Sequence, residues 1–320
     1  MEIIGGKRYI NMELIDQIVN LFKCNYNQYH YEAFQSKGGI INLFSDRQFE
    51  CLILYEQGKV LGFAGYYIKN YFSSNILEIL LAHLLVDENY RGKGYGSLLE
   101  KYRLELIEKI KKPKVIYASC VENPRNSIQS KIKRNFYMGG FRYQYRPGKF
   151  ERTNSVVMIY TGGLHKKICI ECPSNLTQKV MKIGNPEIYF KDAIWNNSYT
   201  IKKINEQKLG RIVCHIFSND RKGEKIDDYF LKILKQNKEK YIAVYLSPAI
   251  QGFKYIDKIL INNSFYPLSY IPYIGDGAGI IEYQYVEMGI KGILKDHKIS
   301  NFAKEYLDNL INLNYINNVD

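Results

Sequence analysis

Residues 84–99 read Leu84-Leu85-Val86-Asp87-Glu88-Asn89-Tyr90-Arg91-Gly92-Lys93-Gly94-Tyr95-Gly96-Ser97-Leu98-Leu99. An apolar run ends at Val86, three glycines follow at alternating positions, and an amphipathic helix is predicted to begin at once. Glycine lets a backbone approach a ligand closely. The N–H groups and the positive dipole end at the start of a helix attract anions. With Arg91 and Lys93 adding charge at the rim, the stretch predicts a pyrophosphate-binding loop.

Other glycine loops have different spacings. A P-loop needs Gly-x-x-x-x-Gly-Lys-Ser/Thr, which is absent here. A dinucleotide fingerprint needs Gly-x-Gly-x-x-Gly, whereas these glycines stand at 92, 94 and 96. A glycine-rich turn without a ligand is the remaining alternative.

Outward from the loop, the first half alternates helices and strands. Apolar spacing predicts helices over residues 12–34, 97–111 and 126–138, and strands over 49–55, 60–67, 76–86, 115–120, 141–145 and 155–160. Thr161-Gly162-Gly163 is the best break in the chain, and a similar alternation restarts after it. We therefore expect an α/β (mixed α+β) fold of two domains, residues 1–163 and 164–320, each with a central mixed β-sheet flanked by helices.

The motif Arg91-x-x-Gly94-x-Gly96 after Leu84-Leu85-Val86-Asp87 resembles the acetyl-CoA signature of the GNAT superfamily of N-acetyltransferases. The Gly140-Phe141 pair after the third predicted helix resembles a second marker of that family. The resemblance implies that the strand ending near Val86 pairs with the pantetheine arm and that the loop amides hold the pyrophosphate. The cofactor-binding residues implied are Leu84, Leu85, Val86, Arg91, Gly92, Lys93, Gly94, Tyr95, Gly96 and Ser97.

The catalytic groups implied are fewer. In the family a tyrosine four residues before the glycine of Gly-Phe often protonates the departing thiolate; here that position is Phe136, and Tyr137 follows it. Tyr137 can serve if the helix end is locally distorted, because one residue is about 100° around a helix. Glu78 and Glu122 are the candidate bases. Strand alternation predicts that Glu78 and His83 point to opposite faces, and His83 is interpreted as an interior histidine.

The second half resembles a degenerate copy of the same domain. The counterpart of the phosphate loop, residues 218–225, holds one glycine and two acidic residues, so we expect a single coenzyme A site per chain. The second half then closes the cleft, selects the acceptor or forms a homodimer interface. Cys169 and Cys172 have the spacing of half a zinc site, but no second pair accompanies them, so no metal is expected.

Composition limits the partners. The net charge is +13, which suits a polyanion such as coenzyme A, but the chain has no dense Lys/Arg run and no nucleic-acid-binding motif. No apolar stretch approaches the roughly 20 residues that cross a bilayer. The first residues lack the apolar core of a secretion signal. A cytoplasmic protein without membrane or nucleic-acid partners is expected.

These observations predict an N-acyltransferase that uses acetyl-CoA, or another acyl-CoA, to acylate a primary amine of a small metabolite or antibiotic-like compound. Transfer is expected to be direct, within a ternary complex. Two alternatives stay open. A protein or RNA acyltransferase is suggested by the charge, and a non-catalytic coenzyme A sensor is suggested by Phe136.

Overall fold

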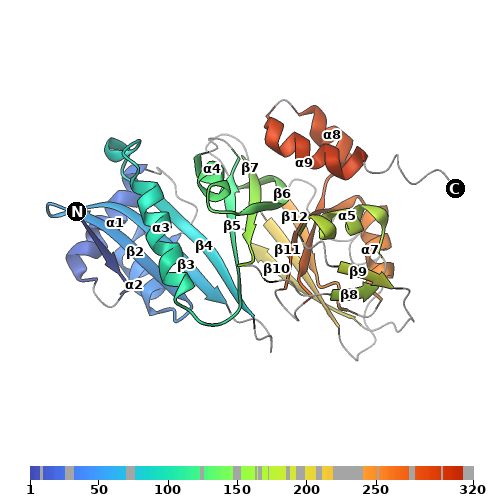
Figure 1. The fold of residues 1–320 in the computed structure, drawn as a ribbon, viewed down its shortest axis with the longest axis horizontal. Helices are drawn as coiled ribbons and strands as arrows, with labels where there is room; N and C mark the ends of the chain where they lie inside the picture. The colour runs from blue at the N-terminus through green and yellow to red at the C-terminus, as the bar shows by residue number, and fades with distance from the viewer. Residues whose placement is uncertain are drawn as a thin grey trace. The chain divides into compact units, whose positions relative to one another are not determined.

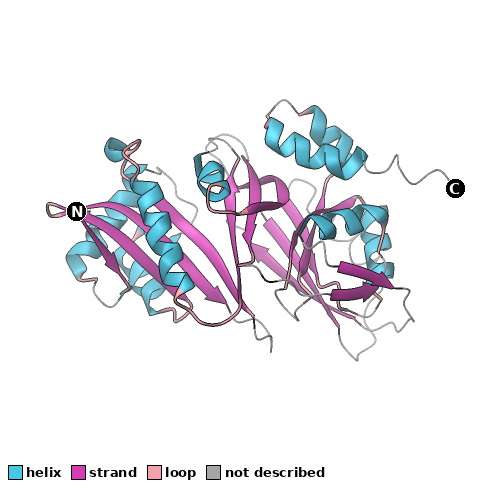
Figure 2. Cartoon of the chain, in the orientation of Figure 1, coloured by secondary structure: helices cyan, strands magenta, loops and turns pink. Residues whose placement is uncertain are grey.

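The structure is a computed structural model, and its helices and strands alternate along the chain (Figures 1 and 2). It describes residues 1–7, 10–25, 32–69, 76–122, 126–146, 153–162, 164, 168–171, 173–184, 188–191, 199–206, 211–218, 241–250, 252–273, 278–296 and 298–312. The chain divides into two compact units, residues 1–70 with 77–118, and residues 71–76 with 119–320. The predicted boundary at residues 163/164 lies inside the second unit and stays a prediction.

Unit 1 is a mixed sheet with helices on both faces. Its strands lie in the order β1 (Glu2–Gly5), β2 (Phe49–Glu56), β3 (Lys59–Lys69), β4 (Leu77–Val86) and β5 (Lys114–Val121). The last three residues of β5 belong to unit 2. Its helices are α1 (Met12–Asn25), η2 (Glu32–Gln35), α2 (Lys37–Ser45), η3 (Glu88–Tyr90) and α3 (Tyr95–Glu108). Figure 1 shows α3 in front of the sheet and α1 and α2 behind it.

The predicted β2–β3 hairpin is confirmed. Gln57 and Gly58 both have positive φ, 49° and 80°, as a two-residue turn between twisted antiparallel strands requires. The core behind the sheet is formed where α1 packs on β2 and β3, and Phe22, Phe34 and Phe63 meet there as close aromatic pairs. The hairpin thus presents its inner face to α1.

Unit 2 contains α4 (Asn126–Ile132), β6 (Tyr137–Arg146), β7 (Thr153–Tyr160), β8 (Ile168–Glu171), α5 (Asn175–Gly184), β9 (Ile188–Lys191), β10 (Tyr199–Glu206), β11 (Arg211–Ser218), β12 (Tyr241–Leu246), α7 (Phe253–Asn262), β13 (Phe265–Ile271), β14 (Ile280–Tyr285), α8 (Gly289–Lys295) and α9 (Asn301–Asn312). The sheet order within this unit is β7-β6-β13-β14-β12-β11-β10, and β8 and β9 form a separate parallel pair.

Strand directions in the second half repeat those of the first. The antiparallel pair β3/β4, the parallel pair β4/β5 and the antiparallel pair β6/β7 have counterparts in β10/β11, β11/β12 and β13/β14. This is the pattern expected of a degenerate copy. The segment predicted to replace the phosphate loop lies, apart from Ser218, outside the described residues, and the helix predicted over residues 225–236 falls there too.

One helix prediction is wrong in a way that matters for the site. The helix predicted over residues 126–138 ends at Ile132, and Tyr137 opens strand β6. The turn between them contains Asn135 at φ 60°, and asparagine tolerates this left-handed conformation better than most residues. Asn135 therefore ends the helix turn, and Phe136 after it is buried.

The Gly139-Gly140 pair lies inside β6 and has a packing role. A Cβ on Gly140 would stand 1.9 Å from the Cβ of Ser269, the residue that it faces on β13. A Cβ on Gly139 would meet the Ile159 side chain of β7 just as closely. These glycines let neighbouring strands approach, so the prediction that they close a helix is wrong.

Among the residues described, no helix combines the length and the apolar character that crossing a membrane requires.

Candidate functional site

Strand β4 contains an extra residue where it approaches the loop. Its register with β3 shifts between the pairs Gly65↔Ala82 and Phe63↔Leu85, so three steps on β4 oppose two on β3. His83 lies in this bulge at φ 55°, a conformation that is uncommon for a residue other than glycine. Bulges and such backbone conformations cluster beside functional sites.

The ladder between β4 and β5 stops short of the bulge. The two strands pair in parallel from Leu77↔Lys114 to Leu81↔Ala118, whereas β4 itself continues for five more residues to Val86. The predicted cofactor residues Leu84, Leu85 and Val86 are thus on the part of β4 beyond this ladder. Such a segment can pair its backbone with an extended ligand arm.

The glycine loop connects β4 to α3 through a short 3-10 turn, η3. Gly92 and Gly94 have φ values of 80° and 81°, and a Cβ built on either would have no heavy atom within 4 Å. Gly94 is the N-cap of α3 and offers no side-chain cap. The first N–H that bonds within the helix is that of Leu98, which donates to Gly94 O at 3.0 Å. The N–H groups of Tyr95 and Gly96 precede it and have no carbonyl one turn earlier in the helix.

Charged and aromatic side chains surround this helix start. Arg91 donates from Nη2 to Asn25 Oδ1 at 2.6 Å, which ties the loop to the end of α1. The ammonium of Lys93 lies 4.7 Å from the centroid of the Tyr90 ring, and Tyr90 stacks on Tyr95 at 6.4 Å. The open space above the glycines, the amides and the two cations fit an extended anion such as a pyrophosphate.

A buried ion pair supports the loop from beneath. Arg103 of α3 is 1% exposed and pairs with Glu100, one turn earlier on the same helix. Its Nη1 donates to Gly65 O at 2.7 Å and to Ala82 O at 3.0 Å, the two residues that face each other just before the bulge. This arginine therefore fixes α3, and with it the loop, to the bulged part of β4.

Glu78 is buried at the start of β4. It accepts a hydrogen bond from the Tyr117 hydroxyl at 2.5 Å. Burial raises the pKa of Glu78 above its ordinary value, and Lys69 and the Tyr117 hydrogen bond offset that effect in part. A raised pKa suits a carboxylate that accepts a proton near neutral pH.

We expect Glu78→Gln to stabilise unit 1 at neutral pH and to have no effect at acid pH. Because the folded-state pKa is raised, the carboxyl of the native protein holds its proton where the unfolded chain has lost it, so stability falls as pH rises above the unfolded value of about 4.3. Glutamine cannot ionise and escapes this loss. Urea midpoints of the two proteins should coincide near pH 4 and separate toward pH 8, with the variant higher. A constant difference at all pH values would contradict the assignment.

The prediction that Glu78 and His83 point to opposite faces is wrong. Tyr67 and Lys69 share one face of β3, and Lys69 pairs with Glu78. The Tyr67 hydroxyl lies 3.2 Å from His83 Nε2, and the imidazole also contacts Phe34 and Phe49. The bulge resets the alternation, so that both side chains lie on the α1 side of the sheet. A bulge leaves no signal in the apolar run that predicted this strand.

Tyr137 does not lie on a helix. It pairs with Ile159 at the start of β6, and burial followed by the proximity of Tyr273 raises the pKa of its hydroxyl. Phe136 beside it stacks on Tyr160 at 5.4 Å. The assignment of Tyr137 as the acid that protonates the thiolate stays a prediction.

Sequence reasoning missed Lys131 of α4. The helix is followed by Asn135-Phe136 and not by Gly140-Phe141. The position four residues before this turn, counted as for the expected proton donor, is therefore Lys131. Its side chain is 2% exposed, and its ammonium lies 5.8 Å from the centroid of the Phe136 ring. An Asn-Phe pair after an amphipathic helix is a signal that could have placed this turn.

Glu122 has a structural role in unit 2. It accepts from Asn154 Nδ2 at 2.9 Å and from the backbone N–H of Ser300 at 2.7 Å. Ser300 precedes α9 and accepts from the N–H of Ala303, as an N-cap does. A carboxylate at this position also complements the helix dipole. Its assignment as a base stays a prediction.

Within the described ranges no group of three or more His, Cys, Asp or Glu side chains is placed to bind a metal ion. Cys169 lies on β8, and Cys172 is outside the described residues.

Comparisons with known proteins give one family. Residues 15–130 match the Acetyltransferase (GNAT) family, a span that runs from α1 through the loop and β5 into α4. No curated protein sequence matches the chain.

Solved structures cover about half of the chain. The ribosomal-protein-S18-alanine N-acetyltransferase from Escherichia coli has 15% identity and a TM-score of 0.40, over 52% of this chain and 99% of that one. The aminoglycoside 6'-N-acetyltransferase from Enterococcus faecium has 16% identity and a TM-score of 0.38, over 50% and 97%. An aminoglycoside 6'-N-acetyltransferase complexed with coenzyme A has 15% identity and a TM-score of 0.36, over 50% and 97%.

Proposed function

Residues 15–130 belong to the GNAT acetyltransferase family, whose members take the acyl group from acetyl-CoA, and from this premise we propose that the protein acetylates a primary amine of a small metabolite or antibiotic-like compound. The observation that supports acetyl-CoA as the donor is the loop Arg91–Gly96, with its two left-handed glycines and the exposed start of α3. The family match identifies residues 15–130 as an acetyltransferase domain. The identity of the amine acceptor is what we propose.

Donor binding is assigned to unit 1. The N–H groups of Tyr95, Gly96 and Ser97, with Gly92 and Gly94 beneath open space, would bind the pyrophosphate. Arg91 and Lys93 would offset its charge. Leu84, Leu85 and Val86, beyond the last β4–β5 pair, would form backbone hydrogen bonds with the pantetheine arm.

Transfer is proposed to be direct. The amine nitrogen attacks the thioester carbonyl carbon, the carbon–sulfur bond breaks, the amine gives up a proton, and the coenzyme A thiolate takes one. Glu78, with its raised pKa, is the proposed acceptor of the amine proton, either itself or through water. Tyr137 is retained as the proposed proton donor, and Glu122 as a second candidate base, below Glu78 because Asn154 and Ser300 engage it.

The choice of a small acceptor rests on the second half. That half repeats the strand pattern without a comparable glycine loop in its sequence, which favours a role in shaping an acceptor site or a homodimer over a second donor site. The aminoglycoside acetyltransferases named above act on small amines, and the ribosomal-protein enzyme acts on a protein. Both acceptor classes therefore enter the test.

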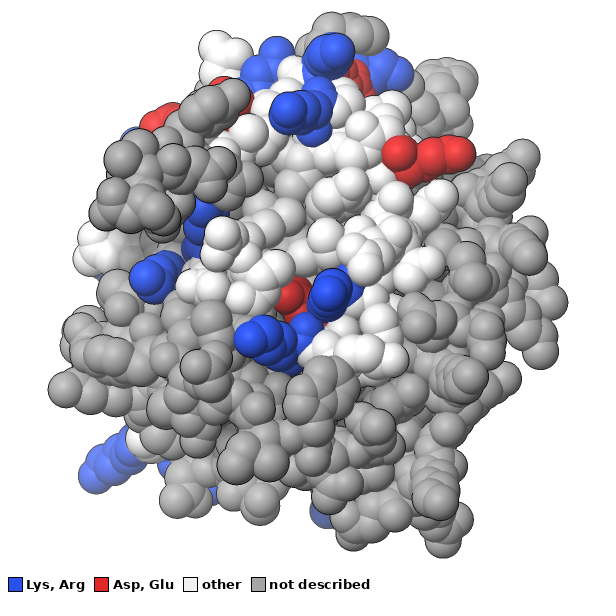
Figure 3. Space-filling view, turned by 90° about the vertical axis from the view of Figure 1, so that its right-hand side faces the viewer, with Lys and Arg blue, Asp and Glu red and all other residues white. Residues whose placement is uncertain are grey.

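The net charge of +13 favours a second candidate, a protein or RNA acceptor. Figure 3 shows one face on which the Lys and Arg side chains of the described residues stand in separate groups, with acidic side chains among them. On the described part of this face, the basic side chains do not form the continuous basic surface that is the usual footprint of a nucleic-acid partner. We rank the small amine first.

The test is coenzyme A release from acetyl-CoA with three acceptor sets: small polyamines and aminoglycosides, peptides with a free N-terminus, and RNA. We expect release above background with a small amine, at a rate that changes little between 50 and 300 mM salt. Activity confined to peptides or RNA, with steep salt dependence, would replace the small amine by the second candidate. If the protein binds acetyl-CoA but releases no coenzyme A with any of the three acceptor sets, the protein is a non-catalytic coenzyme A sensor and not an acetyltransferase.

A further inference from the structure

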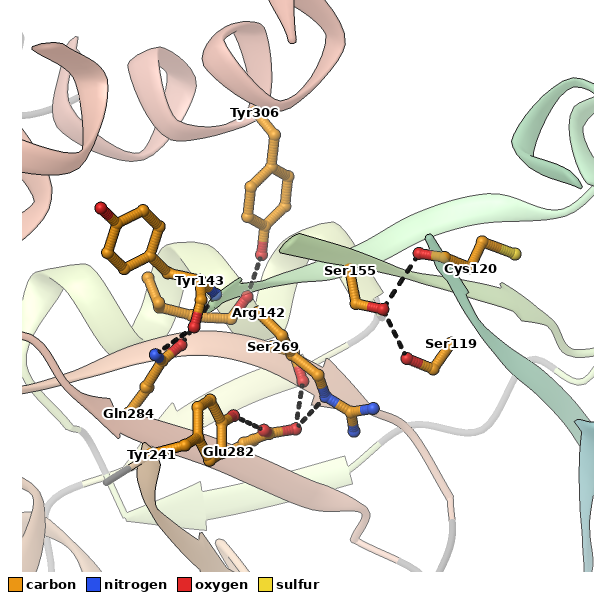
Figure 4. Close-up of polar contacts among 11 residues, drawn as sticks. Ser119, Cys120, Arg142, Tyr143, Ser155, Tyr241, Ser269, Glu282, Gln284 and Tyr306 are labelled. Atoms are coloured by element: carbon orange, nitrogen blue, oxygen red, sulfur yellow. Dashed lines mark hydrogen bonds and ion pairs between the residues drawn. The ribbon is translucent and has the colours of Figure 1, made fainter. Parts of the chain in front are cut away.

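Arg142 of β6 lies inside unit 2. Its side chain is 6% exposed, and its Nε donates to Glu282 Oε2 of β14 at 2.7 Å (Figure 4). The guanidinium carbon lies 4.6 Å from the centroid of the Tyr145 ring. One nitrogen and one face of the guanidinium are thus used to orient it.

Glu282 is satisfied without the rest of that guanidinium. Its Oε1 accepts from the Tyr241 hydroxyl at 2.5 Å, and its Oε2 accepts from Arg142 Nε and from the Ser269 hydroxyl at 3.4 Å. Three donors therefore converge on one buried carboxylate. The ion pair is therefore monodentate, although arginine and a carboxylate commonly form two parallel hydrogen bonds.

The outer edge of the guanidinium has no such partner. Among the described residues, Nη1 and Nη2 of Arg142 donate to no acceptor, and Figure 4 shows both turned away from Glu282. The buried polar side-chain atoms that lack a hydrogen-bond partner in the described residues are Glu100 Oε1 and Arg103 Nε, and they do not include Nη1 or Nη2 of Arg142. A planar fork with about four N–H donors is consequently left without a described acceptor on a side chain that is almost buried.

Aromatic side chains surround the same fork. Burial lowers the pKa of Arg142, but Glu282, Tyr245, Tyr145 and Tyr241, all close enough to interact electrostatically, raise it well above its ordinary value. Arg142 therefore stays charged under all ordinary conditions. The site combines a fixed cation, low polarity around it and hydroxyl groups.

We propose that the Arg142 fork, held by Glu282 and Tyr145, is a binding site for the carboxylate of a small molecule. A carboxylate matches the spacing of Nη1 and Nη2 and carries a single charge. A doubly charged phosphate group would meet stronger repulsion from Glu282 at this depth. The low exposure of Arg142 restricts the occupant to a thin, small molecule. None of the residues assigned to this site belongs to the acetyl-CoA loop. A direct binding measurement therefore tests the site whether or not the proposed function holds.

The experiment measures thermal unfolding of the full chain in sodium acetate and in sodium chloride at equal ionic strength. We expect 100 mM acetate to raise the unfolding midpoint by about 2 °C or more over chloride, as linkage predicts for a ligand at several times its Kd. Sodium phosphate is the third arm and should give a smaller rise than acetate. Phenylglyoxal labelling of Arg142, read by mass spectrometry, should slow in acetate.

Two variants separate binding from folding. Arg142→Lys keeps the charge and loses the fork, whereas Arg142→Met with Glu282→Met removes both charges and leaves no orphan ion. Both should lose the acetate effect. Arg134→Lys is the matched control, because Arg134 follows α4 and its Nη1 donates to Ser130 of that helix, so its substitution should leave the effect intact.

Equal midpoints in acetate and chloride for the natural sequence would overturn the proposal. An acetate effect that survives in both Arg142 variants would overturn it as well. Phosphate stabilising as much as acetate would reject the carboxylate assignment.

Discussion

Gly94→Val is expected to weaken acetyl-CoA binding by about 100-fold, which corresponds to about 2.7 kcal/mol. Gly94 stands at φ 81° as the N-cap of α3, a conformation that a β-branched residue strongly disfavours. A valine would force the backbone out of this conformation and turn away the amides that the proposal assigns to the pyrophosphate. Losing two charge-assisted hydrogen bonds accounts for the expected size. Isothermal titration with acetyl-CoA measures it.

Gly58→Val is the matched control. Gly58 has φ 80° in the β2–β3 turn, and a Cβ there meets nothing within 4 Å, just as at Gly94. Both variants should lose about 1–3 kcal/mol of folding stability through backbone strain. Only Gly94→Val should lose donor affinity. If the two variants bind acetyl-CoA equally well, the loop is not the phosphate site.

The loop was predictable because its chemistry is local. Glycines at 92, 94 and 96 between an apolar run and a helix specify a turn and a helix start within one stretch of chain, and α3 begins at Tyr95, within two residues of the predicted start. The β2–β3 turn was predictable for the same reason. Gly58 permits the left-handed conformation that a two-residue hairpin needs.

The failures depend on contacts distant in sequence. Gly139 and Gly140 are glycines because Ile159 and Ser269 approach them, and nothing in residues 126–141 announces either neighbour. The bulge at His83 is stabilised from α3 and β3 and leaves the apolar pattern of β4 unchanged. The true end of α4 at Ile132, with the turn at Asn135 after it, was hidden by a more conspicuous glycine pair. Arg142 escaped notice because its partner, Glu282, lies 140 residues away.

Glu100→Ala or Arg103→Met is expected to destabilise the protein by about 3–5 kcal/mol, because each leaves one buried ion without its counterion. Arg103→Met also removes the donor shared by Gly65 O and Ala82 O beside the bulge. Urea unfolding at pH 7 measures the loss. Lys101→Ala is the control, because it breaks an exposed ion pair with Glu105 on the same helix. This variant should lose no more than about 0.5 kcal/mol of folding stability.

The double variant Glu100→Met with Arg103→Met decides what the pair is for. Two apolar side chains of similar volume leave no orphan charge, so the double variant should recover most of the stability that either single change loses. The two carbonyls at the bulge would still lack their donor, and we therefore expect acetyl-CoA affinity to stay reduced although the fold is restored. A double variant that recovers stability and full affinity would show that the ion pair only fills the core. One that recovers stability alone would show that Arg103 positions the β4 bulge and the start of α3 for the donor.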